Sequence, residues 1–222
     1  MMWNAAKNKE IGRWTKPMSK HAIRHLRGEP AMSALIEKIG PIRLLPRRLP
    51  PFQALAHAII HQQLSGKAAG TILERFKLLF PGEEFPSPAA VVGTSPDKLR
   101  GAGLSRPKAG YIIELARHCE AGLIPSLPEC DALTDDEIIA RLTEIRGIGR
   151  WTVEMLLIFN LGRPDVLPVH DLGVRRGFQI AYGKRKMPEP EKLADYGRRW
   201  GPYRTLAARY LWRAADFTAK PD

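Results

Sequence analysis

Residues 142–151 read Leu-Thr-Glu-Ile-Arg-Gly-Ile-Gly-Arg-Trp and are the most informative stretch of the chain. Gly147 and Gly149 stand between an amphipathic segment and an apolar one, which predicts two helices joined by a tight turn. Glycine is favoured where φ is positive or where another backbone comes close. The N–H groups of residues 148–151 would then point outward at the start of the second helix, where a phosphate can bind without sequence being read. Two close glycines are also common in ordinary helix hairpins, so the turn alone leaves both interpretations open.

A second stretch, residues 167–173, reads Leu-Pro-Val-His-Asp-Leu-Gly and places one carboxylate at the expected start of another helix. Asp is a preferred N-cap residue, so capping alone is the simplest interpretation of Asp171. A helix N-terminus also keeps a carboxylate ionised. A fixed anion close to a sugar C1′ stabilises an oxocarbenium ion or holds water for attack. Capping and catalysis are compatible, and we predict that Asp171 does both.

The composition favours a globular protein with a polyanionic partner. The chain has 222 residues, 44% of them hydrophobic, and 35 Lys and Arg against 23 Asp and Glu, which gives a net charge of +12. This excess favours nucleic acid as the partner, although a generally basic protein would also show it. Two cysteines are too few for a disulfide framework or a Cys-ligated iron–sulfur cluster. We expect a cytoplasmic monomer (nucleoid-associated if bacterial) without a secretory signal, membrane span or cofactor.

The hydrophobic pattern is helical almost throughout, so the predicted fold class is all-α. We expect two helical subdomains flanking a cleft. The central one covers residues 51–171 and contains the helix-hairpin-helix at about 134–161, and the other combines residues 19–50 with 172–222. Residues 1–18 are expected to form a flexible lead, and residues 125–128 a break. Helices are predicted at residues 18–26, 31–39, 52–64, 67–80, 87–92, 95–100, 106–121, 134–144, 150–160, 171–182, 189–200 and 202–217.

Two further features have a functional and a simpler interpretation. Residues 61–69 read His-Gln-Gln-Leu-Ser-Gly-Lys-Ala-Ala, a helix end with two amides followed by a small polar turn. An enzyme that extracts a base from a duplex must fill the vacancy, which Gln63 would do, but amides in solvent are the simpler interpretation. Likewise Trp151, Tyr210 and Trp212 are either core residues or the flat walls of a pocket for an extruded base.

Together these residues resemble the helix-hairpin-helix–Gly/Pro/Asp superfamily of DNA base-excision glycosylases. Residues 142–157 and 166–177 carry the resemblance, and residues 61–69 and 147–155 are similar to its AlkA-type 3-methyladenine DNA glycosylase II branch. The resemblance implies a monofunctional enzyme of base excision repair. Such an enzyme flips alkylated bases of the 3-methyladenine and 7-methylguanine type out of double-stranded DNA and hydrolyses their N-glycosidic bonds.

The resemblance also implies a role for each matching residue. Asp171 corresponds to the essential aspartate, Gln63 to the side chain that fills the vacancy, and Ser65 to a minor-groove contact. Trp151 stands where bifunctional relatives carry the lysine that forms a Schiff base, so no lyase activity is expected. The expected base-pocket residues are Trp151, Met155, Tyr210 and Trp212, with Met155 at a position that can be a pocket tyrosine in relatives. The expected DNA contacts are Gln63, Leu64, Ser65, Arg146, Gly147, Ile148, Gly149, Arg150, Gly173 and Arg175.

No catalytic metal is expected, and the resemblance implies a monovalent cation at the hairpin carbonyls near Gly147. Three other functions stay open at this point. A glycosylase for deaminated bases would act on neutral leaving groups and would benefit from protonating them. A non-catalytic helix-hairpin-helix protein would explain the charge and the turn, but neither Asp171 nor the aromatic residues. A bifunctional lyase would need another lysine in place of Trp151.

Overall fold

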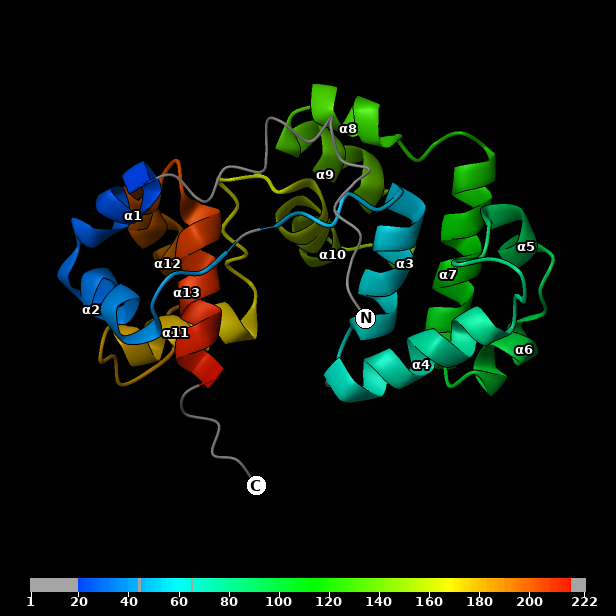
Figure 1. The fold of residues 1–222 in the computed structure, drawn as a ribbon, viewed down its shortest axis with the longest axis horizontal. Coiled ribbons are helices and arrows are strands. Elements are labelled where there is room, and N and C mark those ends of the chain that lie inside the picture. Colours follow the sequence, from blue (N-terminus) through cyan, green and yellow to red (C-terminus); the bar gives the residue numbers. More distant parts are fainter. Residues whose placement is uncertain (1–19, 44, 65, 217–222) are drawn as a thin grey trace. The chain divides into compact units, whose positions relative to one another are not determined.

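The computed structural model describes residues 20–43, 45–64 and 66–216, and this part of the chain contains helices, turns and loops without a strand (Figure 1). The all-α prediction is therefore confirmed. The described residues divide into two units. Unit 1 contains those up to Arg47 and those from Gly162 onward, and unit 2 is Arg48–Leu161. The predicted lead at residues 1–18 lies outside the described residues.

Unit 2 ends at Leu161, whereas the predicted central subdomain extends to residue 171. Residues 162–171 belong to unit 1, because hydrogen bonds fasten them to the last helix of that unit: Pro164 O accepts from Thr205 N at 3.0 Å, and Thr205 Oγ1 accepts from Val166 N at 3.0 Å. Unit 2 also begins slightly earlier than predicted. Leu49 N and Leu49 O both bond the buried amide of Asn160, at 2.8 Å and 2.9 Å.

Unit 2 is built around the buried helix α3, which contacts α4, α7 and α10. Leu55, Ala56, Ile59 and Ile60 of this helix are fully buried. The helices of unit 2 are α3 (Pro51–His61), α4 (Gly66–Leu78), α5 (Pro88–Val92), α6 (Pro96–Gly101), α7 (Arg106–Glu120), α8 (Leu127–Ala132), α9 (Asp135–Thr143) and α10 (Arg150–Met155).

Two elements of unit 2 differ from the prediction. The expected break at residues 125–128 overlaps the short helix α8, which begins at Leu127. This helix starts in a capping box between Ser126 and Glu129, and Pro128 is compatible with its first turn. Residues 150–160 were expected to form a single helix. The structure has an α-helix, α10, as far as Met155, followed directly by a π-helix, Leu156–Leu161. Serine or threonine side chains cap α5, α6, α7 and α9 at their first turns.

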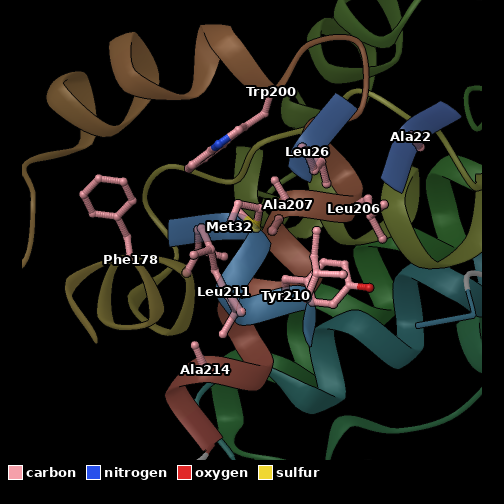
Figure 2. Close-up of a cluster of buried hydrophobic side chains, with 14 of the residues drawn as sticks. Ala22, Leu26, Met32, Phe178, Trp200, Leu206, Ala207, Tyr210, Leu211 and Ala214 are labelled. Atoms are coloured by element: carbon pink, nitrogen blue, oxygen red, sulfur yellow. The ribbon is translucent and has the colours of Figure 1, made fainter. Parts of the chain in front are cut away.

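Unit 1 consists of α1 (Lys20–Arg27), α2 (Pro30–Ile39), α11 (Leu172–Ala181), α12 (Pro190–Gly197), a 3-10 turn (Arg198–Trp200) and α13 (Arg204–Asp216). The core of this unit is shown in Figure 2, where α13 contributes Leu206, Ala207, Tyr210, Leu211 and Ala214. Leu26 and Met32 from the first two helices, with Phe178 and Trp200, pack around them.

A carboxylate ties three elements of unit 1 together. Glu29 stands before α2 and accepts hydrogen bonds from the hydroxyls of Tyr182 and Tyr196 and, at 3.1 Å, from Trp200 Nε1. Burial and the neighbouring carboxylate raise the pKa of the Tyr182 hydroxyl, so it remains a proton donor. Because these aromatic residues follow α11 or belong to α12 and the 3-10 turn, Glu29 joins the N-terminal helices of the unit to its C-terminal part.

The helices α11 and α13 cross very closely at Gly177. A Cβ atom on Gly177 would lie 1.8 Å from Leu211 O and 2.5 Å from Leu211 C, so only glycine permits this approach of the two backbones. The crossing sets how the start of α11, which carries Asp171, lies against α13.

We expect Gly177→Ala to lower the free energy of unfolding by about 3 kcal/mol or more, because the methyl group would overlap backbone that cannot rotate away. Gly110→Ala is the matched control. Gly110 is an exposed glycine inside α7 with open space around it, so its replacement should raise stability by about 0.5–1 kcal/mol. Urea unfolding measures both, and equal effects of the two substitutions would contradict the close crossing.

Candidate functional site

Asp171 sits at the end of a segment that is held firmly within unit 1. Asp165 makes two hydrogen bonds of 2.8 Å with the guanidinium of Arg204, which keeps the pKa of Asp165 below its usual range. Thr205 Oγ1 donates to Arg163 O at 2.7 Å. The chain then turns, and Asp171 N donates to Pro168 O at 3.0 Å. The start of α13 therefore fixes the approach to Asp171.

The Asp171 carboxylate caps α11, as predicted, and two donors orient it. Its Oδ1 accepts a hydrogen bond of 2.8 Å from Val174 N and another of 2.8 Å from Trp212 Nε1 on α13. The residue is half-buried, as Trp212 is, so the carboxylate is not sealed in the interior of its unit. A carboxylate held by two donors has a defined orientation, which a catalytic anion requires.

Gly173 makes this arrangement sterically feasible. A Cβ atom at this position would lie 2.8 Å from Trp212 Cδ1 and 3.1 Å from Asp171 Oδ1. The sequence predicts Gly173 only as a DNA contact, and the structure shows that it leaves room for the indole. The spacing Asp-x-Gly hinted at a close approach, but no sequence pattern indicated which side chain would fill the space.

Two predicted site residues of unit 1, Tyr210 and Arg175, make contacts within the unit that the sequence did not indicate. Tyr210 is fully buried and its hydroxyl donates to Gly40 O at 3.0 Å, so it is a core residue (Figure 2) and not a wall of an open base pocket. Arg175 Nε donates to Pro188 O at 2.9 Å, and its guanidinium lies 3.7 Å from Glu189 Oε2. Arg175 thus anchors the segment before α12, and its assignment as a DNA contact stays a prediction.

In unit 2 the helix-hairpin-helix is present as predicted. It consists of α9, a turn at residues 144–149 and α10, with Gly149 at the N-cap of α10. Gly147 has a φ of +93°, and a Cβ atom on it would lie 2.1 Å from Cγ of the Tyr111 ring. Both the backbone conformation and the contact with Tyr111 therefore require glycine.

Not every residue of the turn faces outward. Ile148 is buried, and its N–H donates to Ile145 O at 3.0 Å, so we correct its assignment as a DNA contact to that of a core residue. The side chains of Arg146 and Arg150 are exposed, and Arg150 Nε also donates to Glu154 Oε1 at 3.1 Å. The N–H groups available to an anion are thus expected from Gly149 onward.

The end of α3 adjoins the hairpin. A hollow of about 640 Å³ is lined by Gln62 and Gln63 after α3, by Lys108 and Tyr111 of α7, and by residues 143–149 of the hairpin. Gln62 Nε2 donates to Thr152 Oγ1 at 2.9 Å and makes a longer contact of 3.4 Å with Gly147 O. The sequence indicates no separate role for Gln62, beyond its place beside Gln63.

Gln63 has an unusual backbone conformation for a residue other than glycine. Its φ is +56°, a left-handed conformation that costs about 1–2 kcal/mol in a residue with a side chain. Its side chain is exposed, and that of Leu64 is 40% exposed. Strained residues cluster at functional positions, which agrees with a role for Gln63 in filling a vacancy in DNA. Ser65 lies outside the described residues.

The two remaining predicted pocket residues, Trp151 and Met155, lie on α10 and are half-buried. The exposed Arg150 lies at the start of the same short helix. The structure brings Asp171, Gly173 and Trp212 together in unit 1. In unit 2 it brings the end of α3 and the hairpin together.

The described residues contain no cluster of three or more His, Cys, Asp or Glu that would hold a metal ion. The monovalent cation implied at the hairpin would instead be held by backbone oxygens. Gly147 O, which Gln62 Nε2 contacts at 3.4 Å, is an oxygen donor of the kind that hard cations take, so the turn fits such an ion in its type of ligand. The cation stays a prediction. Among the described helices, none is both long and apolar enough to cross a bilayer.

The comparison with protein families agrees with this geometry. The model of the HhH-GPD superfamily of base excision DNA repair proteins matches residues 56–202, which include the end of α3, the hairpin and Asp171. The chain belongs to this superfamily. The resemblance inferred from the sequence motifs is confirmed.

Several relatives are similar over most of their length. DNA-3-methyladenine glycosylase 1 of Schizosaccharomyces pombe is 38% identical, covering 83% of this chain and 82% of the relative. The solved structure of a 3-methyladenine DNA glycosylase (Mag1) from the same species, in complex with abasic DNA, is 35% identical, with a TM-score of 0.83, and covers 91% of this chain and 100% of that one. The structure of a DNA-3-methyladenine glycosidase from Bacillus halodurans is 36% identical, with a TM-score of 0.77, and covers 90% of this chain and 91% of that one.

We expect Gly147→Ala to lower the free energy of unfolding by about 2–5 kcal/mol, from the left-handed backbone and the overlap with Tyr111 together. Gly149→Ala is the control within the same turn, since Gly149 has a φ of −88° and open space where a Cβ would lie. It should change stability by about 1 kcal/mol or less. Urea unfolding of both variants checks this difference, and a Gly149→Ala variant as unstable as Gly147→Ala would refute it.

Proposed function

We propose that this protein is a monofunctional DNA glycosylase of base excision repair that hydrolyses the N-glycosidic bonds of alkylated bases flipped out of duplex DNA. The observation that carries the proposal is the Asp171 carboxylate, oriented by Val174 N and Trp212 Nε1 at the start of α11. Membership of a superfamily of base excision DNA repair proteins and the similarity to 3-methyladenine glycosylases support it.

Asp171 acts on the sugar in this proposal. In a purine alkylated at N3 or N7, the base is cationic and leaves as a neutral molecule, taking the electron pair of the bond from C1′ to nitrogen. The sugar becomes an oxocarbenium ion, which the anion of Asp171 stabilises. Water then attacks C1′ and loses a proton, which leaves an abasic site. No general acid is needed for such a leaving group, in keeping with a single oriented carboxylate.

The aromatic residues of the site would recognise the charge of the lesion. An indole facing a cationic base is favoured by about 1–2 kcal/mol through cation–π attraction. Trp212 is placed for this beside Asp171, because its Nε1 already donates to the carboxylate. Trp151 is a second candidate. Because Trp151 also stands where bifunctional relatives have a lysine, we propose hydrolysis without strand cleavage by β-elimination.

The protein would bind double-stranded DNA through the phosphate backbone and through the gap that the flipped nucleotide leaves. The N–H groups at the start of α10 and the exposed Arg146 are suited to phosphate, which fixes position without reading sequence. The exposed Gln63 would occupy the gap left by the flipped nucleotide. The net charge of +12 agrees with a polyanionic substrate.

The first test is base release from methylated duplex DNA. The wild-type protein should release alkylated purines, identified by chromatography, and Asp171→Asn should lower the rate by about 100-fold or more while still binding DNA. The amide keeps the size and can still accept from Val174 N, so loss of charge is isolated. Undiminished base release by the variant would remove Asp171 from its role. Release of hypoxanthine alone would instead indicate a glycosylase for deaminated bases, and borohydride trapping of the DNA would indicate a lyase.

A second test separates orientation of the carboxylate from stacking. Trp212→Phe keeps an aromatic face and removes the Nε1 donor, so the maximal rate should fall by about tenfold, the value of one hydrogen bond to a charged group. The affinity for DNA should change little, because phosphate contacts lie elsewhere. Single-turnover rates and binding by fluorescence anisotropy measure the two quantities. An unchanged rate would show that the indole does not orient Asp171.

A further inference from the structure

The C-terminal end of α3 leaves backbone carbonyls that need donors, as every helix end does. Gln62 N donates to Ala58 O and Ile59 O at 3.1 Å and 3.3 Å, and Leu64 N donates to His61 O at 3.3 Å. Ile60 O, the remaining carbonyl of this last turn, has a side-chain donor from another helix.

That donor is Lys108 of α7. Its Nζ donates to Ile60 O at 2.8 Å and to Gln62 O at 2.6 Å, so one ammonium group joins the last turn of α3 to the residue that follows it. Burial lowers the pKa of the Lys108 ammonium. Lys108 also lies in the first turn of α7, where the helix dipole disfavours a cation. Burial and the helix dipole thus both disfavour the positive charge of Lys108, at the position where its ammonium donates to the carbonyls that precede Gln63.

Gln62 extends this arrangement to the hairpin. Its main-chain oxygen is held by Lys108, while its side-chain amide donates to Thr152 Oγ1 of α10 at 2.9 Å. Thr152 is buried, so the amide is attached to a rigid part of the unit. The residue immediately before Gln63 is thus fixed from two sides. Gln63 itself has the left-handed φ of +56° and an exposed side chain.

We propose that Lys108 is a positioning residue for Gln63. Its ammonium holds the carbonyls of Ile60 and Gln62 so that Gln63 is presented in its left-handed conformation before DNA arrives, and Gln62 keeps the presented side chain in register with the phosphate-binding hairpin. This inference rests on the proposed function, since it concerns the side chain that fills the vacancy in DNA. A side chain ordered in advance does not have to be ordered during binding, which favours the extruded state of the nucleotide.

A double-mutant cycle of Lys108→Met and Gln63→Ala tests the proposal. K108M keeps an unbranched side chain of similar length without the donors, and should lower the single-turnover rate of base release by between about tenfold and 100-fold, the effect of misplacing a group in the site. If Lys108 acts through Gln63, K108M should add little to Q63A. In duplexes with 2-aminopurine next to the lesion, K108M should also weaken the fluorescence change that reports extrusion.

Two further variants complete the experiment. Lys98→Met is the matched control, because Lys98 is an exposed lysine of α6 in the same unit, and its rate should equal that of the wild type. Lys108→Arg retains several N–H donors and should keep most of the rate. Urea unfolding verifies that each variant is folded, and if K108M does not fold, Lys108→Gln replaces it in the same cycle.

The outcomes are distinct for the two proposals. A wild-type protein that releases no base contradicts the glycosylase function, and the role of Lys108 with it. If the wild-type protein releases bases but the effects of K108M and Q63A on the activation free energy add in the double variant, only the role of Lys108 is contradicted. A folded K108M variant with the wild-type rate also contradicts only that role.

Discussion

The hydrogen bond from Trp212 Nε1 to Asp171 Oδ1 is the interaction on which the candidate catalytic centre depends. It joins the start of α11 to the middle of α13, and it forms only because the two helices lie very close together. Gly177 permits the close crossing of the backbones, and Gly173 leaves the space that the indole occupies. The orientation of the Asp171 carboxylate thus depends on having glycine at positions 173 and 177 as much as on the hydrogen-bond donors themselves.

The same principle applies in unit 2, where the absence of a side chain at Gly147 lets the hairpin turn pack on the ring of Tyr111. The turn is further joined to the end of α3 by the amide of Gln62. The segment that we propose to fill the vacancy in DNA and the turn that we propose to bind phosphate are therefore parts of one hydrogen-bonded structure. Rigid elements hold both, which is the condition for geometric precision in a site built largely from loops.

Much of this could be predicted from local patterns. Helical periodicity predicted the all-α class, and the glycine pair predicted the hairpin between α9 and α10. The position of Asp171 predicted the N-cap of α11, because capping depends on residues close in the chain. The errors came from interactions between distant residues. Tyr210 and Trp212 are two positions apart on α13 and therefore lie on different faces of it, and packing within unit 1 decides that the face of Tyr210 is core and that Trp212 lies beside Asp171. Ile148 similarly turns inward within a loop that was expected to face a ligand.

The sequence by itself determined the helices, the hairpin and the acidic residue at a helix start, because these follow from periodicity, glycine and capping over a few residues. Tertiary structure alone decided that Trp212 is the second donor to Asp171, that residues 162–171 bond to the last helix, and that Lys108 donates to the carbonyls at the end of α3. Each of these pairs residues that are dozens of positions apart. Their meeting depends on how closely whole helices pack, which no local pattern of the chain records.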